Sequence, residues 1–338
     1  MNKRALLIVS TSYPDRADGS EAAGSFVADL VDALSSHFSV RVVGPGRTEG
    51  PEEGCRFPTW RFTAGGIALS LLSPLKPWHW PLILRVLLSM RRQVFLAAAD
   101  GNVTHTLALW VLPSGWAARE LSKATGVSYS VWALGSDVWS LGRLPLVRKV
   151  LANVSRGAQF AYADGIQLAH DAEAASGRSF DFMPSCRALA GVRDGPIAAS
   201  PPYRLLYLGR WHRNKGTDLL FDALDELGDL DWAKIAEVHI AGGGPLHSLV
   251  HQRAKRLIEH GRPIRLSGFV DKVGAEHALG NADRLLIPSR VESIPVVFSD
   301  ALAYGVPVVS MPVGDLPSLL SGGGGWVADG TGGKSFAK

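Results

Sequence analysis

The expected fold is decided by one stretch of the chain, Pro288-Ser-Arg-Val-Glu292-Ser-Ile-Pro-Val-Val-Phe-Ser-Asp300-Ala-Leu-Ala-Tyr-Gly305-Val-Pro-Val-Val309. The short apolar run before it, residues 284–287, stops at Pro288 and is typical of a buried strand. Apolar residues then recur at helical spacing as far as Gly305, and a second apolar run follows. The pattern predicts a strand, a loop, a helix and a strand in succession, which is the repeating unit of a parallel α/β sheet.

Two acidic residues occupy this frame, Glu292 in the loop and Asp300 within the helix. Ser293 is a candidate helix cap, and Pro295 suits the first helical position because its missing N–H would have no partner there. The free N–H groups at the start of that helix would form an anion site. A diphosphate and the hydroxyl groups of a sugar fit this arrangement. An ordinary crossover with two solvated acids explains the same pattern equally well.

Length and composition indicate a folded protein with room for two domains. The chain has 338 residues, of which 46% are hydrophobic and 20% charged. Its net charge of +4 is spread without a dense Lys/Arg run, which argues against nucleic acid as a partner. Cys55 and Cys186 lack the spacing of metal ligands, so we expect reduced thiols in a cytoplasmic protein. No apolar run reaches the roughly 18 residues of a membrane span.

Strand-like and helical patterns alternate in both halves of the chain, and a segment rich in Gly, Pro and Ala, residues 191–202, separates the halves. We therefore expect an α/β protein with two Rossmann-like α/β/α domains that face each other across a cleft. The first domain is predicted to span residues 1–190 and the second residues 203–338. Ligands of such sheets bind at the carboxyl ends of the strands.

A basic loop, residues 209–216, follows a predicted strand and precedes a predicted helix in the second half. Its Arg210 and Lys215 are placed to neutralise a diphosphate, where negative charge builds up as a nucleotide leaves. A solvated basic turn is the plainer interpretation. The glycine-rich turn at residues 241–246 lacks the spacing of a dinucleotide fingerprint.

Three candidates lie in the first half. Glycines at residues 19 and 24 fall between a predicted strand and a predicted helix, and this loop with Gly24 could face a phosphate or a sugar across the cleft. An ordinary flexible loop explains the same residues equally well. His105 ends an apolar strand, where a hydrogen-bonded core residue is more common than a site residue. Asp137 follows another strand, at the end where α/β sites are built. It could orient an acceptor hydroxyl, although capping of a helix is the favoured interpretation.

A basic segment that bears tryptophans, residues 59–92, has two interpretations. It contains Trp60, Trp78 and Trp80 together with many leucines, and several Lys and Arg residues. Such a segment can lie on the anionic face of a membrane. Packing of the aromatic side chains against their own domain is the favoured alternative. The protein is therefore expected in the cytoplasm, with peripheral association at the cytoplasmic membrane face left open.

Taken together these stretches resemble the glycosyl transferases of group 1, that is, glycosyltransferase family 4 with the GT-B fold. The strongest pieces occur in family order: LYLGRWHRNKG, HIAGGGPL, IRLSGFV and IPSRVESIPVVFSDALAYGVPVV. SYPDRADGSEAAGSFVADLVDAL and THTLALWVLPSGWAARELSKATGVSYSVWALGSDVW in the first half are also similar to the family.

The resemblance implies a nucleotide-sugar donor, bound mainly by the second domain, and an acceptor held by the first. It also implies retention at the anomeric carbon, no essential metal, and no cofactor besides the donor. Arg210 and Lys215 would hold the diphosphate, Glu292 the donor sugar and Asp300 the ribose. Further donor contacts would come from Gly24 near the phosphate, from Val270 and Asp271 beside the base, and from the backbone of Ser293, Ile294, Pro295, Val296 and Val297.

Three departures from the family pattern keep alternatives open. Asp300 stands where the family usually has a glutamate, and Leu134 stands where many members have a histidine. The expected closing helix is missing, so the chain is predicted to be truncated at its C-terminus. The main hypothesis is transfer of a hexosyl group from a UDP- or GDP-sugar to a glycan or lipid-linked acceptor, in polysaccharide or glycolipid synthesis. The alternatives are an inactive member that binds nucleotide or partner proteins, and a sugar-phosphate synthase.

Overall fold

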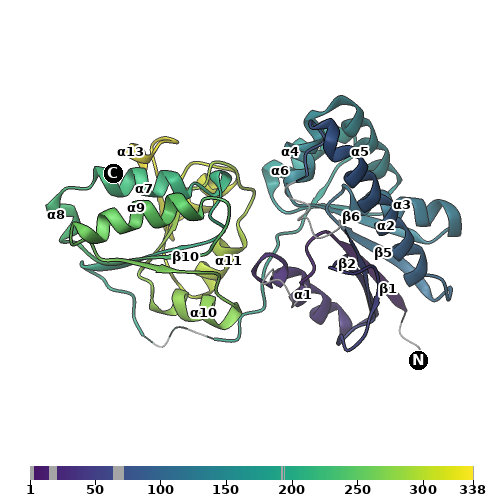
Figure 1. Cartoon of the computed structure of the whole chain (residues 1–338), viewed down its shortest axis with the longest axis horizontal. Coiled ribbons are helices and arrows are strands. Elements are labelled where there is room, and N and C mark those ends of the chain that lie inside the picture. Colours follow the sequence, from purple (N-terminus) through teal and green to yellow (C-terminus); the bar gives the residue numbers. More distant parts are fainter. Residues whose placement is uncertain (1–3, 15–20, 64–71, 192, 194, 338) are drawn as a thin grey trace. The chain divides into compact units, whose positions relative to one another are not determined.

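The computed structural model describes residues 4–14, 21–63, 72–191, 193 and 195–337. The chain divides into two compact units, Met1–Pro184 and Ser185–Lys338. The segment expected to link two domains therefore belongs to the second unit. Figure 1 shows that each unit is a sheet with helices on its faces.

The first unit is built on a sheet with the strand order β3-β4-β2-β1-β5-β6-β7-β8, in which only β3 and β4 pair antiparallel among the described strands. Every residue of β1 is buried, as expected for a central parallel strand covered on both faces. The strands are β1 (Ala5–Ser10), β2 (Ser39–Pro45), β3 (Gly50–Glu52), β4 (Thr59–Phe62), β5 (Val103–Leu109), β6 (Ser128–Ala133), β7 (Ala161–Ala163) and β8 (Asp181–Phe182).

Helices cover both faces of this sheet. Helix α1 packs on one face, whereas α2, α3, α5 and α6 form a layer on the other. The apolar residues of α2 recur at helical spacing, so that Val86, Met90, Val94 and Ala97 are buried against the sheet. The helices are α1 (Glu21–Ser35), η2 (Pro77–His79), α2 (Trp80–Ala97), α3 (Ser114–Thr125), α4 (Ser136–Trp139), η3 (Leu141–Arg143), α5 (Pro145–Gly157) and α6 (Ile166–Ser176).

The second unit contains a parallel sheet with the strand order β11-β10-β9-β12-β13-β14. Figure 1 shows α7 and α9 on one side of this sheet and α10 on the other. The strands are β9 (Tyr203–Leu208), β10 (Ile235–Ala241), β11 (Ile264–Ser267), β12 (Arg284–Ile287), β13 (Val308–Ser310) and β14 (Gly325–Val327). The helices are η4 (Arg213–Lys215), α7 (Thr217–Glu226), α8 (Asp229–Trp232), α9 (His247–Glu259), α10 (Lys272–Asn281), α11 (Val296–Ala303), α12 (Leu316–Leu320) and α13 (Gly333–Phe336).

The predicted α/β class with parallel sheets is confirmed. Residues 284–310 form β12, a loop, α11 and β13, in the predicted order. Two local predictions were wrong: α11 begins at Val296, so Pro295 is its N-cap and not its first helical residue, and Ser293 does not cap the helix. Ser293 is instead buried in the loop.

Candidate functional site

The candidate donor residues of the second unit gather at one edge of its sheet. The strands β11, β10, β9 and β12 are neighbours and run parallel, so the loops after them leave from the same edge. The loop after β9 carries Arg210 and Lys215, and the loop after β12 carries Glu292. Val270 and Asp271 follow β11 at that edge.

The two charged loops meet through Lys215 and Glu292. The Lys215 ammonium donates to both carboxylate oxygens of Glu292, with Nζ–Oε1 and Nζ–Oε2 distances of 2.7 and 2.9 Å. The Ser289 hydroxyl donates to Oε1 at 2.8 Å. The Glu292 side chain is nearly buried and that of Lys215 is 40% exposed. A negatively charged ligand can therefore still reach the ammonium.

Two residues that the sequence analysis missed hold these loops together. Arg290 makes a two-pronged ion pair with Asp218, with Nη–Oδ distances of 2.7 and 2.8 Å. The backbone N–H of Arg290 also donates to the Asn214 carbonyl at 2.8 Å. A Cβ on Gly216 would lie 1.7 Å from the Pro288 carbonyl oxygen, so only glycine fits where the loops cross. The site is thus assembled on two neighbouring strands whose loops are locked to each other.

Electrostatics favour an anion at this edge. Burial lowers the pKa of His212, and the positive charges of Arg210 and Lys215 lower it further. Burial would raise the pKa of Asp218, but the hydrogen bonds and charge of Arg290 bring this pKa below its ordinary value. Arg290 is therefore paired with Asp218 within the scaffold, whereas Arg210 is exposed to solvent and Lys215, although paired with Glu292, stays 40% exposed.

The glycine-rich turn after β10 packs directly on the loop after β9. A Cβ on Gly242 would lie 1.9 Å from the Gly209 carbonyl oxygen. The Trp211 backbone N–H donates to the Gly243 carbonyl at 2.8 Å, and the Trp211 ring is buried. The glycines therefore allow the close approach of two backbones, which agrees with the absence of a dinucleotide fingerprint.

Helix α11 contributes its N-terminus and a buried acid. The helix starts at Val296, so its first backbone N–H groups have no acceptor within the helix. The Asp300 side chain is 1% exposed and forms an ion pair with Arg187, whose Nε lies 3.0 Å from Oδ2. Asp300, assigned to a ribose by the family resemblance, is thus engaged by a cation of its own unit.

Asp271 has a structural role at the same edge. It is the N-cap of α10 and accepts a hydrogen bond from the Gly274 backbone N–H at 2.8 Å. Val270, just before it, is half-buried. Among the described residues no three His, Cys, Asp or Glu side chains are grouped so that they could hold a metal ion.

The first-unit candidates occupy structural positions. Gly24 lies inside α1 rather than before it, and a Cβ there would be 2.0 Å from the Ser12 carbonyl oxygen. His105 lies within β5 rather than at its end. Its Nδ1 is 2.8 Å from the Ser128 hydroxyl, and its Nε2 is 2.8 Å from the Ser130 hydroxyl. Burial lowers the pKa of His105. The loop before α1, residues 15–20, is outside the described residues.

Asp137 is buried at the start of α4 and joins two loops. Its carboxylate accepts backbone hydrogen bonds from Val111 at 2.7 Å, Val138 at 3.2 Å and Leu134 at 3.3 Å. Burial raises the pKa of Asp137 to about 6 despite these donors. Asp137 therefore holds the loops after β5 and β6 together at the carboxyl edge of the first sheet.

Comparison with known sequences relates the second unit to enzymes that transfer sugars. Residues 202–338 match the family model of the glycosyl transferases group 1. The chain is 31% identical over 161 residues to the GDP-mannose-dependent α-(1-6)-phosphatidylinositol monomannoside mannosyltransferase of Mycolicibacterium smegmatis, a match that covers 44% of this chain and 40% of the relative. It is 31% identical over 148 residues to a D-inositol 3-phosphate glycosyltransferase of Catenulispora acidiphila, covering 42% and 35%. Each match spans less than half of the relative.

Comparison with solved structures extends the likeness to both units. The HepE protein of Anabaena, in complex with UDP, has a TM-score of 0.67 and 16% identity, with 99% of this chain and 88% of that chain covered. Sucrose-phosphate synthase of Thermosynechococcus elongatus has a TM-score of 0.71 and 19% identity, again with 99% of this chain and 88% of that chain covered. The chain therefore has the GT-B fold, and residues 202–338 within its second unit are similar in sequence to the glycosyl transferases group 1.

Proposed function

We propose that this protein transfers a hexosyl group from a UDP- or GDP-linked sugar to a glycan or lipid-linked acceptor, with retention at the anomeric carbon and without a catalytic metal. The observation that carries the proposal is the contact of Lys215 with Glu292 at the carboxyl edge of the second sheet. It joins a cation suited to a diphosphate and a carboxylate suited to sugar hydroxyls, within the region that matches the family model.

The proposed step uses the charges of this edge. The bond between the anomeric carbon and the phosphate oxygen breaks, and its electron pair leaves with the nucleoside diphosphate. The acceptor oxygen forms the new bond from the same face, and its proton passes to the departing phosphate. Arg210, Lys215 and the first N–H groups of α11 stabilise the negative charge that grows on the leaving group. Glu292 positions the sugar through its hydroxyls.

The test combines calorimetry with transfer assays over a panel of nucleotide sugars and acceptors. We expect Lys215→Ala and Glu292→Ala each to lower turnover about 10²-fold or more, because each removes a group that contacts the reacting donor. Lys255→Ala is the matched control, since this lysine is exposed on α9 and pairs only loosely with Glu259, at 3.8 Å. Near-full turnover in either site variant would refute the assignment, and no binding of UDP or GDP would refute the function.

A second candidate is a protein that binds nucleotide sugar without turning it over. The ion pair of Asp300 with Arg187 favours it, because a carboxylate already neutralised by a guanidinium is a poorer acceptor for ribose hydroxyls. Calorimetric binding of a nucleotide, with neither donor hydrolysis nor transfer to any acceptor of the panel, would select this candidate. Sugar phosphates belong in the same panel, because transfer to one of them would identify a sugar-phosphate synthase.

A further inference from the structure

The turn before α2 and the outer face of that helix expose large apolar side chains. Trp78 is 73% exposed and Trp80 is 60% exposed, and Leu75, Leu84 and Leu88 are each more than half exposed. Packing against their own domain, the interpretation favoured from sequence, is wrong for these two tryptophans. It holds for Trp60, which packs beside the core beneath α2. Apolar clusters of this kind mark interaction surfaces.

The charged residues of this segment itself are all positive. Residues 72–97 contain Lys76, Arg85, Arg91 and Arg92, and no Asp or Glu. All four cations are exposed. Arg91 lies over the Phe95 ring at 4.7 Å, and Arg92 approaches Glu49 of another segment at 3.5 Å. A surface of tryptophan, leucine and arginine matches the boundary between lipid headgroups and acyl chains, where aromatic rings sit and phosphates attract cations.

Helix α5 repeats this combination in the same helical layer. Helix α3 packs against both α2 and α5, and the three helices lie side by side in Figure 1. A groove of about 490 Å³ between α5 and α6 is lined by Arg148, Lys149 and Arg156 without an acidic residue. Leu146, at the start of α5, is 78% exposed. Residues 140–157 contain no Asp or Glu either.

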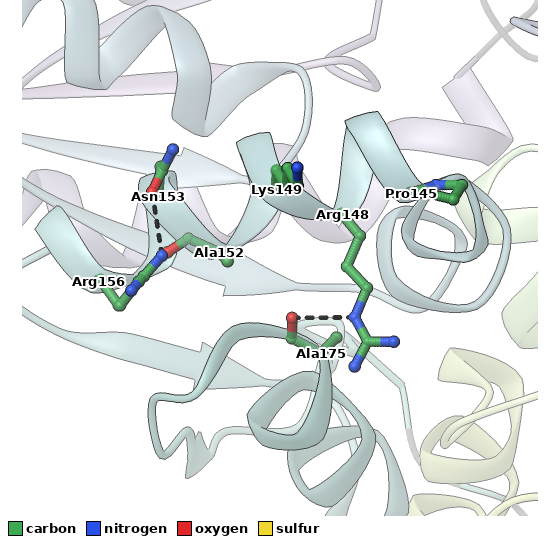
Figure 2. Close-up of a pocket in the computed structure, with 7 residues that line it drawn as sticks. All are labelled: Pro145, Arg148, Lys149, Ala152, Asn153, Arg156 and Ala175. Carbon is green, nitrogen blue, oxygen red and sulfur yellow. Dashed lines mark hydrogen bonds between the residues drawn. The ribbon is translucent and has the colours of Figure 1, made fainter.

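The groove is partly organised before any ligand arrives. Figure 2 shows Arg148 and Arg156 on α5, with the carbonyl of Ala175 facing Arg148. Arg148 Nη2 donates to the Ala174 carbonyl at 2.7 Å, near the end of α6, and Arg156 donates to the Asn153 side chain at 3.0 Å. These contacts hold two guanidinium groups at the groove while leaving donor N–H groups for a phosphate.

We propose that the outer surface of α2 and α5 docks on a membrane interface that contains anionic phospholipid. Trp78, Trp80 and the exposed leucines enter the headgroup region, and the cations meet lipid phosphates, one of which the α5–α6 groove receives. No helix of the described residues is long and apolar enough to cross a bilayer. The docking does not depend on the proposed transfer reaction, although it would bring the protein to a lipid-linked acceptor.

The test is sedimentation of the whole chain with vesicles of phosphatidylcholine alone or mixed with phosphatidylglycerol. We expect binding to the mixed vesicles that falls with added salt, and little binding to phosphatidylcholine alone. The double variant Trp78→Ser, Trp80→Ser should lower the bound fraction about ten-fold. The matched control is Leu230→Ser, which changes a residue of α8 that is 83% exposed, and it should bind as the unchanged chain does.

Charge variants test the electrostatic half of the proposal. Arg85→Gln and Lys149→Gln should each weaken partition into the mixed vesicles about five-fold, as expected for one cation near an anionic surface. Lys255→Gln on α9 is the control. The absence of vesicle binding, or equal binding of the tryptophan variant, would overturn the proposal.

Two other occupants of the surface have their own signatures. Saturable binding of inorganic phosphate that Lys149→Gln abolishes, without vesicle binding, would assign the groove to a soluble phosphate and overturn the lipid proposal. Dimerisation that the tryptophan variant abolishes, again without vesicle binding, would assign the face to a second copy of the chain. Neither experiment contains a sugar donor, so failure here leaves the proposed transfer intact.

Discussion

Asp300 is the residue at which the family resemblance and the structure differ most. The resemblance implies that Asp300 holds a ribose, and in the structure its carboxylate is 1% exposed and paired with Arg187, which is 11% exposed. We expect Arg187→Met to destabilise the protein by about 3–5 kcal/mol, because it leaves a buried carboxylate without its partner. Urea unfolding, followed by tryptophan fluorescence, measures the change.

A double-mutant cycle decides whether the two side chains act as a pair. Asp300→Leu leaves the Arg187 guanidinium without its partner. The double variant with Arg187→Met should lose less unfolding free energy than the two single variants lose together. Additive losses would contradict the pairing. If Asp300 contacts ribose as well, Asp300→Leu should also raise the donor KM well beyond the effect of Arg187→Met.

These ionic contacts could not be predicted from sequence because they join distant segments. Arg187 and Asp300 are 113 residues apart, and Arg290 and Asp218 are 72 apart. No sequence pattern indicates that an arginine and an aspartate so far apart will meet. Arg290 and Asp218 come together because β9 and β12 are adjacent strands of the sheet. Lys215 and Glu292 were each named as site candidates because each lies in a recognisable strand–loop–helix pattern, but their contact with each other was not predicted.

At the scale of elements, Asp137 ties the loops after β5 and β6 to α4 through backbone hydrogen bonds. Burial raises its pKa from 3.8 to about 6, so near pH 5 the folded chain holds a proton that the unfolded chain releases. Stability should therefore fall as pH rises from about 4 to 6, by on the order of 3 kcal/mol, and be level above that range. Asp137→Asn removes this titration, so its stability should depend less on pH between 4 and 6. The free energy of unfolding, measured with urea at several pH values, checks this. The same dependence on pH in Asp137→Asn and in the unchanged chain would contradict the prediction.

Element boundaries were predicted well where an apolar run meets a residue that stops it. Strand β12 has the predicted bounds because Pro288 follows a short buried run. Helix α1 begins at Glu21, earlier than predicted, because its first residues, Glu-Ala-Ala, are good helix formers but include no large apolar residue to mark the helix. Strand β5 runs on past His105 to Leu109 because its pairing with β6 continues, and the His105 ring, which interrupts the apolar pattern, contacts the Ser128 and Ser130 hydroxyls of β6.

At the scale of the molecule, each unit has its own core. One cluster of buried residues lies wholly within residues 185–338, and the other three lie wholly within residues 1–184. All the loops that carry Arg210, Lys215 and Glu292 belong to the second unit. A unit that buries its own apolar surface should fold alone.

We therefore expect a fragment of residues 185–338 to unfold cooperatively and to bind UDP or GDP nearly as tightly as the whole chain, while transferring no sugar. Trp211 and Trp232 are buried in its core, so their fluorescence reports native packing during urea unfolding. A second fragment with Lys215→Ala is the control and should fold equally well but bind nucleotide more weakly. A fragment that folds cooperatively yet binds neither nucleotide would show that the donor site needs residues of the first unit. A fragment without a cooperative transition would mean that the second core depends on the first for its stability.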